Sequence, residues 1–116
     1  MDNLNSYREL IKRILSDLAA LINDQHPSSQ SGVDCECVFD DEHGHYLLVK
    51  VGWTGGRRVR ATTLHLRLRN GKIWIEEDMT EEGIATELMA RDVPKEDIVL
   101  AFQSPQMRKH TEFAVA

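Results

Sequence analysis

Residues 64–75 read LHLRLRNGKIWI and contain the strongest local signal in the chain. Leucines alternate with His65 and two arginines, which is the period of a strand that buries one face. Asn70-Gly71 is the preferred pair for a two-residue type I′ turn, so the stretch predicts a β-hairpin with its leucines and isoleucines on the core face. The predicted cross-strand pairs are Arg69 with Lys72, Leu68 with Ile73, Arg67 with Trp74, Leu66 with Ile75, and His65 with Glu76.

Two further strands are predicted before this hairpin. Residues 33–40 place Val33, Cys35, Cys37 and Phe39 on one face and mainly acidic residues on the other, which predicts a half-exposed strand. A polar turn at residues 40–44 then leads into residues 45–53, HYLLVKVGW, which are apolar on both faces. This second run predicts a central strand that is well covered on both sides.

The turn at residues 54–57, TGGR, joins this strand to the next one. A two-residue loop at Gly55-Gly56 would place Arg58 and Arg60 on the same face as Leu64. A β-bulge between Val59 and Leu64 would restore the phase, because it adds one residue to one strand only.

One helix is predicted before the strands in the sequence and another after them. Apolar residues at spacings of three and four predict an amphipathic helix over residues 4–22, with Asn3 as its cap or Ser6 and Glu9 as a capping box. Residues 23–31 are predicted to end this helix and form a polar linker that contains Pro27. A second helix, capped by Asp78 or Thr80, carries Ile84, Ala85, Leu88 and Met89 and ends near Pro94. A short apolar run at residues 98–102 and a short helix opened by Ser104-Pro105 follow.

The predicted fold class is α+β, with an N-terminal helix and a second helix packed on a mainly antiparallel four- to five-stranded meander sheet. At 116 residues, with 41% hydrophobic and 28% charged residues, the chain is expected to form one domain over residues 1–116. No leader pattern and no apolar stretch of membrane-spanning length is present, so a cytoplasmic protein is expected. Cys35 and Cys37 are too close in sequence for an ordinary disulfide and are predicted to be reduced thiols in the core.

Charge is unevenly distributed along the chain. The net charge is -5, yet residues 57–72 contain six Lys and Arg and no Asp or Glu. Cations for phosphates and aromatic faces for stacking suit a nucleic-acid or partner-binding surface. The candidate binding residues are Trp53, Arg57, Arg58, Arg60, His65, Arg67, Arg69, Lys72 and Trp74. In the alternative interpretation Arg67 stacks on Trp74, the other arginines pair with acidic residues, and the segment only keeps a sheet face soluble.

Neither a catalytic nor a metal site is predicted. His65 opposite Glu76, with Asp78 near in sequence, resembles an oriented general base, but no nucleophile or phosphate-binding loop accompanies these residues. His43 and His45 beside three acidic residues at 40–42 offer metal ligands, although a solvated turn explains them better. We therefore expect no catalytic residues, no metal and no cofactor.

Several motifs occur in an order that carries a family resemblance. They are the run from Tyr46 through Gly52-Trp53, the arginines after Gly55-Gly56, GKIWI at 71–75, TEEGIA at 80–85, VPKEDIVL at 93–100, Pro105 with Arg108, and FAVA at 113–116. This order resembles the XisI-like family of fdxN-element excision controlling factors along nearly the whole chain. Asp92 departs from it, because a helix-ending glycine is expected before Val93-Pro94.

The resemblance implies a cyanobacterial accessory factor that helps control excision of the fdxN DNA element beside a site-specific recombinase and a companion factor, XisH. We expect a non-enzymatic regulatory protein that acts through such a partner. The alternative is a direct DNA-binding accessory protein that uses the arginine-rich sheet face. A small hydrolase or nuclease using His65, Glu76 and Asp78 is a third reading, and a symmetric homodimer stays open.

Overall fold

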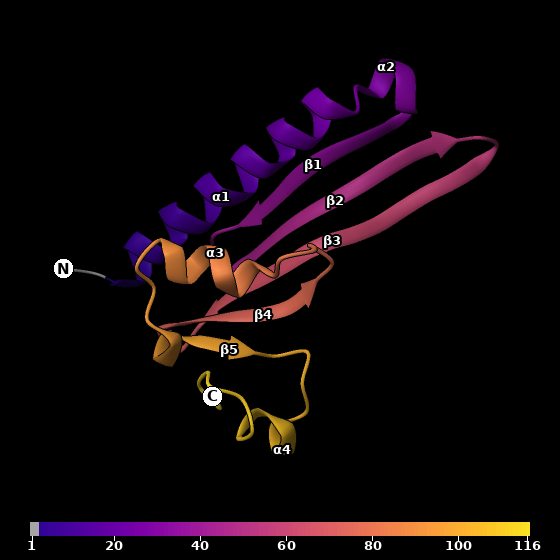
Figure 1. Ribbon diagram of the computed structural model, residues 1–116. Helices are drawn as coiled ribbons and strands as arrows, with labels where there is room; N and C mark the ends of the chain where they lie inside the picture. The colour runs from indigo at the N-terminus through magenta and orange to yellow at the C-terminus, as the bar shows by residue number, and fades with distance from the viewer. Residues whose placement is uncertain (1–2) are drawn as a thin grey trace.

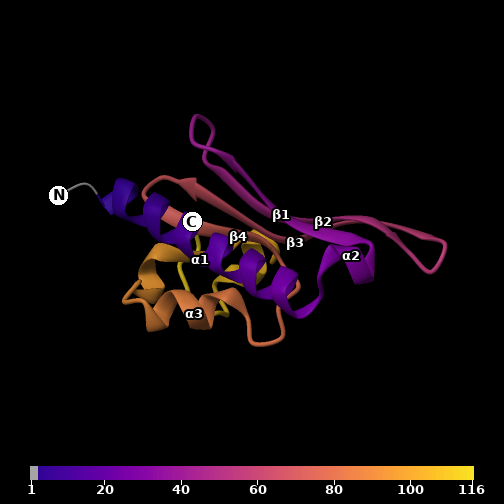
Figure 2. The same cartoon turned by 90° about the horizontal axis from the view of Figure 1, so that it is seen from above.

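The computed structural model describes residues 3–116, which form one sheet with helices packed against it (Figure 1). The strands are β1 (Val33–Asp40), β2 (His45–Thr54), β3 (Arg57–Arg69), β4 (Lys72–Asp78) and β5 (Ile98–Leu100). The helices are α1 (Asn3–Gln25), α2 (Ser28–Ser31), α3 (Ile84–Ala90) and α4 (Pro105–Arg108), with a 3₁₀ turn η1 (Lys95–Asp97). Figure 2 shows α1 and α3 on the same side of the sheet.

The strand order in the sheet is β1-β2-β3-β4-β5. The first four strands form an antiparallel meander, and β5 pairs with β4 in parallel after the chain crosses over through α3. The predicted fold class, a mainly antiparallel sheet with an N-terminal helix and a second helix, is confirmed.

The predicted β3–β4 hairpin is confirmed over four of its five pairs, from Arg69 with Lys72 to Leu66 with Ile75. Both turn residues have positive φ, 54° at Asn70 and 75° at Gly71, as a type I′ turn requires. The fifth predicted pair is wrong, because the register shifts between His65 and Leu66 and His65 lies opposite Glu77. Glu76 is the extra residue of this irregularity.

The predicted bulge in β3 is also confirmed. Leu48 pairs with Leu64 and Val49 with Thr62, so Thr63 is the residue that the ladder passes over. Arg58 and Arg60 therefore point to the opposite face from Leu64, and the hairpin keeps its two-residue loop.

The core lies on one side of the sheet. Ile11 and Leu15 of α1 and Leu88 of α3 are fully buried against the inward side chains of the strands. The buried strand residues include Tyr46, Leu48, Leu64, Leu66, Ile73 and Ile75. The prediction of a central, doubly covered β2 is wrong: β2 is the second strand, and alternate residues Leu47, Val49 and Val51 are only half-buried. Their side chains lie on the face that α1 and α3 leave uncovered.

The ends of the helices differ from prediction in three places. Ser6 lies inside α1, so it forms no capping box, and the side chain of Asn3 lies outside the described residues. The predicted linker is partly helical, because α1 continues to Gln25 and α2 follows Pro27. α3 begins at Ile84 rather than near Thr80. Of the two predicted capping residues, Asp78 does bond the start of the helix, because its Oδ2 accepts a hydrogen bond from the Ile84 N–H at 2.7 Å.

Asp92 follows α3 in the left-handed conformation, with φ of 69°. The N–H of Val93 donates to the carbonyl of Leu88, and the N–H of Asp92 donates to that of Met89. These two bonds form a Schellman motif, in which glycine is the usual residue at this position. The aspartate that departs from the family pattern therefore adopts the backbone conformation of the glycine it replaces.

Candidate functional site

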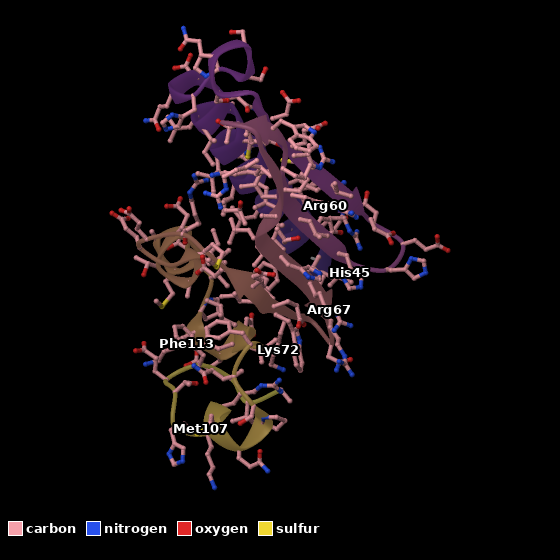
Figure 3. The ribbon with its side chains drawn as sticks, turned by 90° about the vertical axis from the view of Figure 1, so that its right-hand side faces the viewer. His45, Arg60, Arg67, Lys72, Met107 and Phe113 are labelled. Atoms are coloured by element: carbon pink, nitrogen blue, oxygen red, sulfur yellow. The ribbon has the colours of Figure 1, made fainter. Side chains whose placement is uncertain are left out.

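We call the side of the sheet turned away from α1 and α3 the open face. Strand alternation places most of the predicted binding residues on it, together with His45 and a row of apolar side chains on β2. In β2 and β3 its members are His45, Leu47, Val49, Val51, Trp53, Arg58, Arg60, Thr62, His65, Arg67 and Arg69. Figure 3 shows Arg60, His45, Arg67 and Lys72 along one side of the sheet. Arg57 alternates to the other face, at the tip of the hairpin.

Most cations of this segment have no acidic partner. Arg67 Nη1 lies 3.3 Å from Glu76 Oε2, while its buried Nε makes no hydrogen bond. In residues 3–116, Arg57, Arg58, Arg60, Arg69 and Lys72 form no salt bridge. The alternative interpretation expected the arginines other than Arg67 to pair with acidic residues, but in the described part of the chain the one cation of this segment that forms such a pair is Arg67.

The two tryptophans have different environments. Trp53 is 60% exposed, with the guanidinium of Arg58 5.7 Å from its ring centroid. Trp74 is only 6% exposed and lies beneath Arg69 and Arg108, at 5.1 and 5.3 Å. The predicted stacking of Arg67 on Trp74 is wrong, since Arg69 and Arg108 take that place. Trp53 is therefore the exposed tryptophan of the two, and Trp74 is covered by its two arginines.

His65 faces another histidine across the β2–β3 pair. His45 Nδ1 and His65 Nε2 are 2.9 Å apart. Burial lowers the pKa of His65, and the neighbouring His45 lowers it further. Glu76 bonds Arg67, and Asp78 Oδ1 accepts from the Thr80 N–H in addition to the Oδ2 bond to α3. The residues of the hydrolase reading are thus each engaged with other partners.

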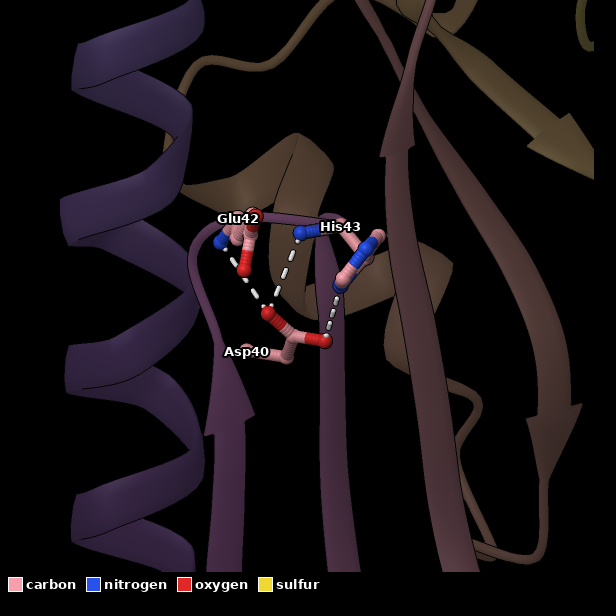
Figure 4. A group of neighbouring side chains, drawn as sticks. All are labelled: Asp40, Glu42 and His43. Atoms are coloured by element: carbon pink, nitrogen blue, oxygen red, sulfur yellow. Dashed lines mark hydrogen bonds and ion pairs between the residues drawn. The ribbon is translucent and has the colours of Figure 1, made fainter.

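The turn between β1 and β2 gathers Asp40, Glu42 and His43 (Figure 4). Asp40 Oδ1 accepts hydrogen bonds from the N–H groups of Glu42 and His43, at 3.0 and 3.1 Å, and Oδ2 lies 2.8 Å from His43 Nδ1. These bonds lower the pKa of Asp40, with the backbone bond from His43 as the largest cause. These bonds explain why the three side chains lie together, since Asp40 caps its own turn. His45 does not join them, because it lies next to His65.

Two shallow hollows lie on the part of the sheet beyond the end of β4, which consists of residues 33–36 of β1, residues 49–54 of β2 and residues 57–62 of β3. One hollow, of about 360 Å³, is lined by Val49, Val51, Arg60, Ala61 and Thr62. The other, of about 350 Å³, lies beside the end of α1, and Ile22, Val33, Cys35, Lys50 and Val59 are among its lining residues. Both cysteines are free thiols, and burial raises the pKa of each.

None of the helices in the described part of the chain is long and apolar enough to cross a membrane.

The fold and the site define a class: a small α+β protein whose meander sheet is covered by helices on one face and carries unpaired arginines on the other. The sequence profile of the XisI protein family matches residues 1–115. The chain belongs to the XisI family.

Two solved structures share this fold closely. An XisI-like protein from Anabaena variabilis is 36% identical, with a TM-score of 0.87 and alignment over 97% of this chain and 99% of that one. The fdxN element excision controlling factor XisI from the same organism is 37% identical, with a TM-score of 0.81 over 99% and 100% of the two chains. No curated protein is similar enough to this chain to count as a match.

Proposed function

We propose that the chain is a non-enzymatic accessory factor in the control of DNA-element excision, and that it acts by binding a protein partner through the open face. Its similarity to an fdxN element excision controlling factor supports a role in this process. The proposed partner is an XisH-like companion factor or the site-specific recombinase itself.

The observation that carries the partner-binding role is the composition of the open face. An exposed Trp53 with Arg58 over its ring stands beside half-buried Val49 and Val51. Trp and Arg next to apolar surface are the residues enriched where protein interfaces concentrate their binding energy. A surface built only for DNA would need its cations but not this apolar row.

Trp53→Ala is expected to weaken binding to the XisH-like factor or the recombinase at least tenfold, because an anchoring aromatic commonly contributes more than about 1.4 kcal/mol to an interface. Co-purification followed by titration calorimetry measures the change in Kd. Leu21→Ala is the matched control, since Leu21 is a similarly exposed apolar residue (52%) on α1. Equal effects of the two substitutions, or no binding by the wild type to either protein, would remove the proposal.

Direct DNA binding is the second candidate function, and the unpaired cations of β3 favour it. Each phosphate contact releases counterions, so the slope of log Kd against log salt reports how many contacts form. Replacing Arg58, Arg60 and Arg69 together by alanine is expected to reduce that slope for duplex DNA by about 3. Arg67 is left in place because it already pairs with Glu76.

The matched control replaces Arg13, Lys95 and Lys109, three exposed cations outside the open face that form no salt bridge within residues 3–116, by alanine. It changes the net charge equally and is expected to leave the slope nearly unchanged. DNA binding that is the same in both triple variants would exclude the open face as a DNA site. Salt-sensitive binding of the chain alone, lost only in the open-face variant, would favour this function over the protein partner.

A further inference from the structure

β3 is longer than the strand that covers its outer edge. It spans Arg57–Arg69, but pairing with β4 begins only at Leu64. The Met79 N–H donates to the Thr63 carbonyl at 2.9 Å, and the chain then leaves the sheet. Figure 1 shows β3 continuing past the tip of β4 toward the hairpin turn. Residues 57–62 therefore form a free edge, although β3 is the third of the five strands in the sheet.

Three residues of this edge present free backbone groups. Because the loop has two residues, Thr54 and Arg57 form a hydrogen-bonded pair. Along the ladder, hydrogen-bonded pairs alternate with pairs that form no hydrogen bonds to each other. Val59 and Ala61 accordingly bond to β2, whereas Arg58, Arg60 and Thr62 turn their N–H and C=O outward. Within residues 3–116 these outward groups have no hydrogen-bond partner.

The two outer edges of the sheet are treated differently. At β1, the side-chain amide of Asn23 donates to the Cys35 carbonyl at 2.8 Å and accepts from the Cys35 N–H at 3.1 Å. At β5, the Ala114 N–H donates to the Ile98 carbonyl at 2.8 Å, and Ala114 bridges Val99. The side chain of Asn23 thus covers part of the β1 edge and Ala114 covers part of the β5 edge, while no other residue within 3–116 bonds the outward backbone groups at 57–62 of β3.

Both faces beside this edge are hollowed. Arg60, Ala61 and Thr62 border the hollow on the open face, and Val59 borders the one near α1. An added strand would place alternate side chains over these two hollows. Its residues on the open face would meet Arg58 and Arg60, and those on the other face would meet Val59 and Ala61.

We propose that the edge of β3 from Arg57 to Thr62 binds an extended segment of a protein partner, with acidic and apolar residues alternating, as an added β-strand. This inference rests on the proposed partner-binding function and assigns its docking mode. Charge selects the occupant, since Arg58 and Arg60 form no salt bridge within residues 3–116 and lie on the face where the acidic residues of the added strand would stand. A second copy paired antiparallel along the same edge would place arginines opposite one another, and like charges in that position are destabilising.

The test uses the full chain and a ten-residue synthetic peptide in which acidic residues alternate with valine. At saturating peptide, hydrogen exchange at the Arg58, Arg60 and Thr62 amides is expected to slow at least tenfold. The amides of Val59 and Ala61, already bonded to β2, are the internal control and should change little. A peptide with lysine at the acidic positions is expected to bind at least tenfold more weakly.

Arg60→Pro separates backbone pairing from charge. Proline removes the outward N–H of Arg60 but no bond to β2, and proline is tolerated in strands whose N–H faces outward. It is expected to weaken peptide binding more than tenfold, whereas Arg60→Ala, which loses only the charge, should weaken it about threefold. If Arg60→Pro does not fold, the wild-type chain is titrated with peptides N-methylated on one edge or the other. The peptide that is N-methylated on the edge facing β3 is then expected not to bind.

The outcomes distinguish this inference from the proposed function. Failure of the peptide to bind, protection at other amides, or equal effects of the proline and alanine variants would overturn strand addition. Concentration-dependent protection of the same amides without peptide would assign the edge to a second copy, and protection by duplex DNA alone would assign it to nucleic acid. Full binding of the XisH-like factor or recombinase by Arg60→Pro would leave the proposed function intact and refute the docking mode.

Discussion

Replacing Gly52 with alanine is expected to lower the free energy of unfolding by about 3 kcal/mol. Gly52 has a φ of 151°, and a Cβ there would lie 2.0 Å from the Gly32 carbonyl oxygen and 2.8 Å from the Val33 Cα. That carbonyl also accepts the hydrogen bond of the Trp53 N–H at 3.0 Å. The start of β1 would have to move away from β2. Urea unfolding followed by circular dichroism measures the loss.

Gly55→Ala is the matched control for this prediction. Gly55 also has a positive φ, 55°, but no atom lies within 4 Å of its would-be Cβ. Only the conformational cost of the left-handed region applies, which is about 1 kcal/mol. Equal losses in the two variants would show that backbone conformation, and not the close approach of β1 and β2, sets the cost at Gly52.

Leu48→Ala is expected to cost about 3 kcal/mol of unfolding free energy, because Leu48 is fully buried and the cavity would lie between the sheet and the helices. Its neighbour Leu47 points to the open face and is half-buried. Leu47→Ala is therefore expected to cost about 1 kcal/mol or less. The same unfolding experiment, on variants one residue apart, compares the two faces of the sheet.

A loss at Leu47 as large as that at Leu48 would contradict the one-sided core. It would mean that another surface covers the open face in the isolated protein. The dependence of the unfolding midpoint on protein concentration then identifies a second copy as that surface.

The sequence was sufficient for those parts of the fold that depend on local chemistry. Asn70-Gly71 determined the hairpin register, and the face conflict between Arg60 and Leu64 called for a bulge between Val59 and Leu64, although only the structure places it at Thr63. Two features depend on tertiary structure instead. The irregularity at Glu76 accompanies its ion pair with Arg67, and the exposure of Val49 depends on where α1 and α3 pack.

The candidate site was predictable in its residues but not in its geometry. The run of cations between Arg57 and Lys72 is plain in the sequence, yet only the structure tells that Arg67 is paired and Arg57 is turned away. Arg108 was missed as a site residue, because it reaches Trp74 only after β5 and α4 return the chain to the sheet. The free edge of β3 depends on the relative lengths of two strands, which periodicity does not give.

The separation of charge in this molecule has a kinetic consequence. A chain with net charge of -5 repels an acidic partner on average, while the unpaired arginines of β3 attract it at short range. Screening limits such attraction to about 8 Å at physiological salt, so the proposed complex would form mainly from encounters in which the open face is turned toward the partner. Added salt would then slow association, whereas the lifetime of the proposed complex would depend mainly on apolar contacts at Trp53 and Val49. In this proposal the arginines set the association rate and the apolar row sets the dissociation rate.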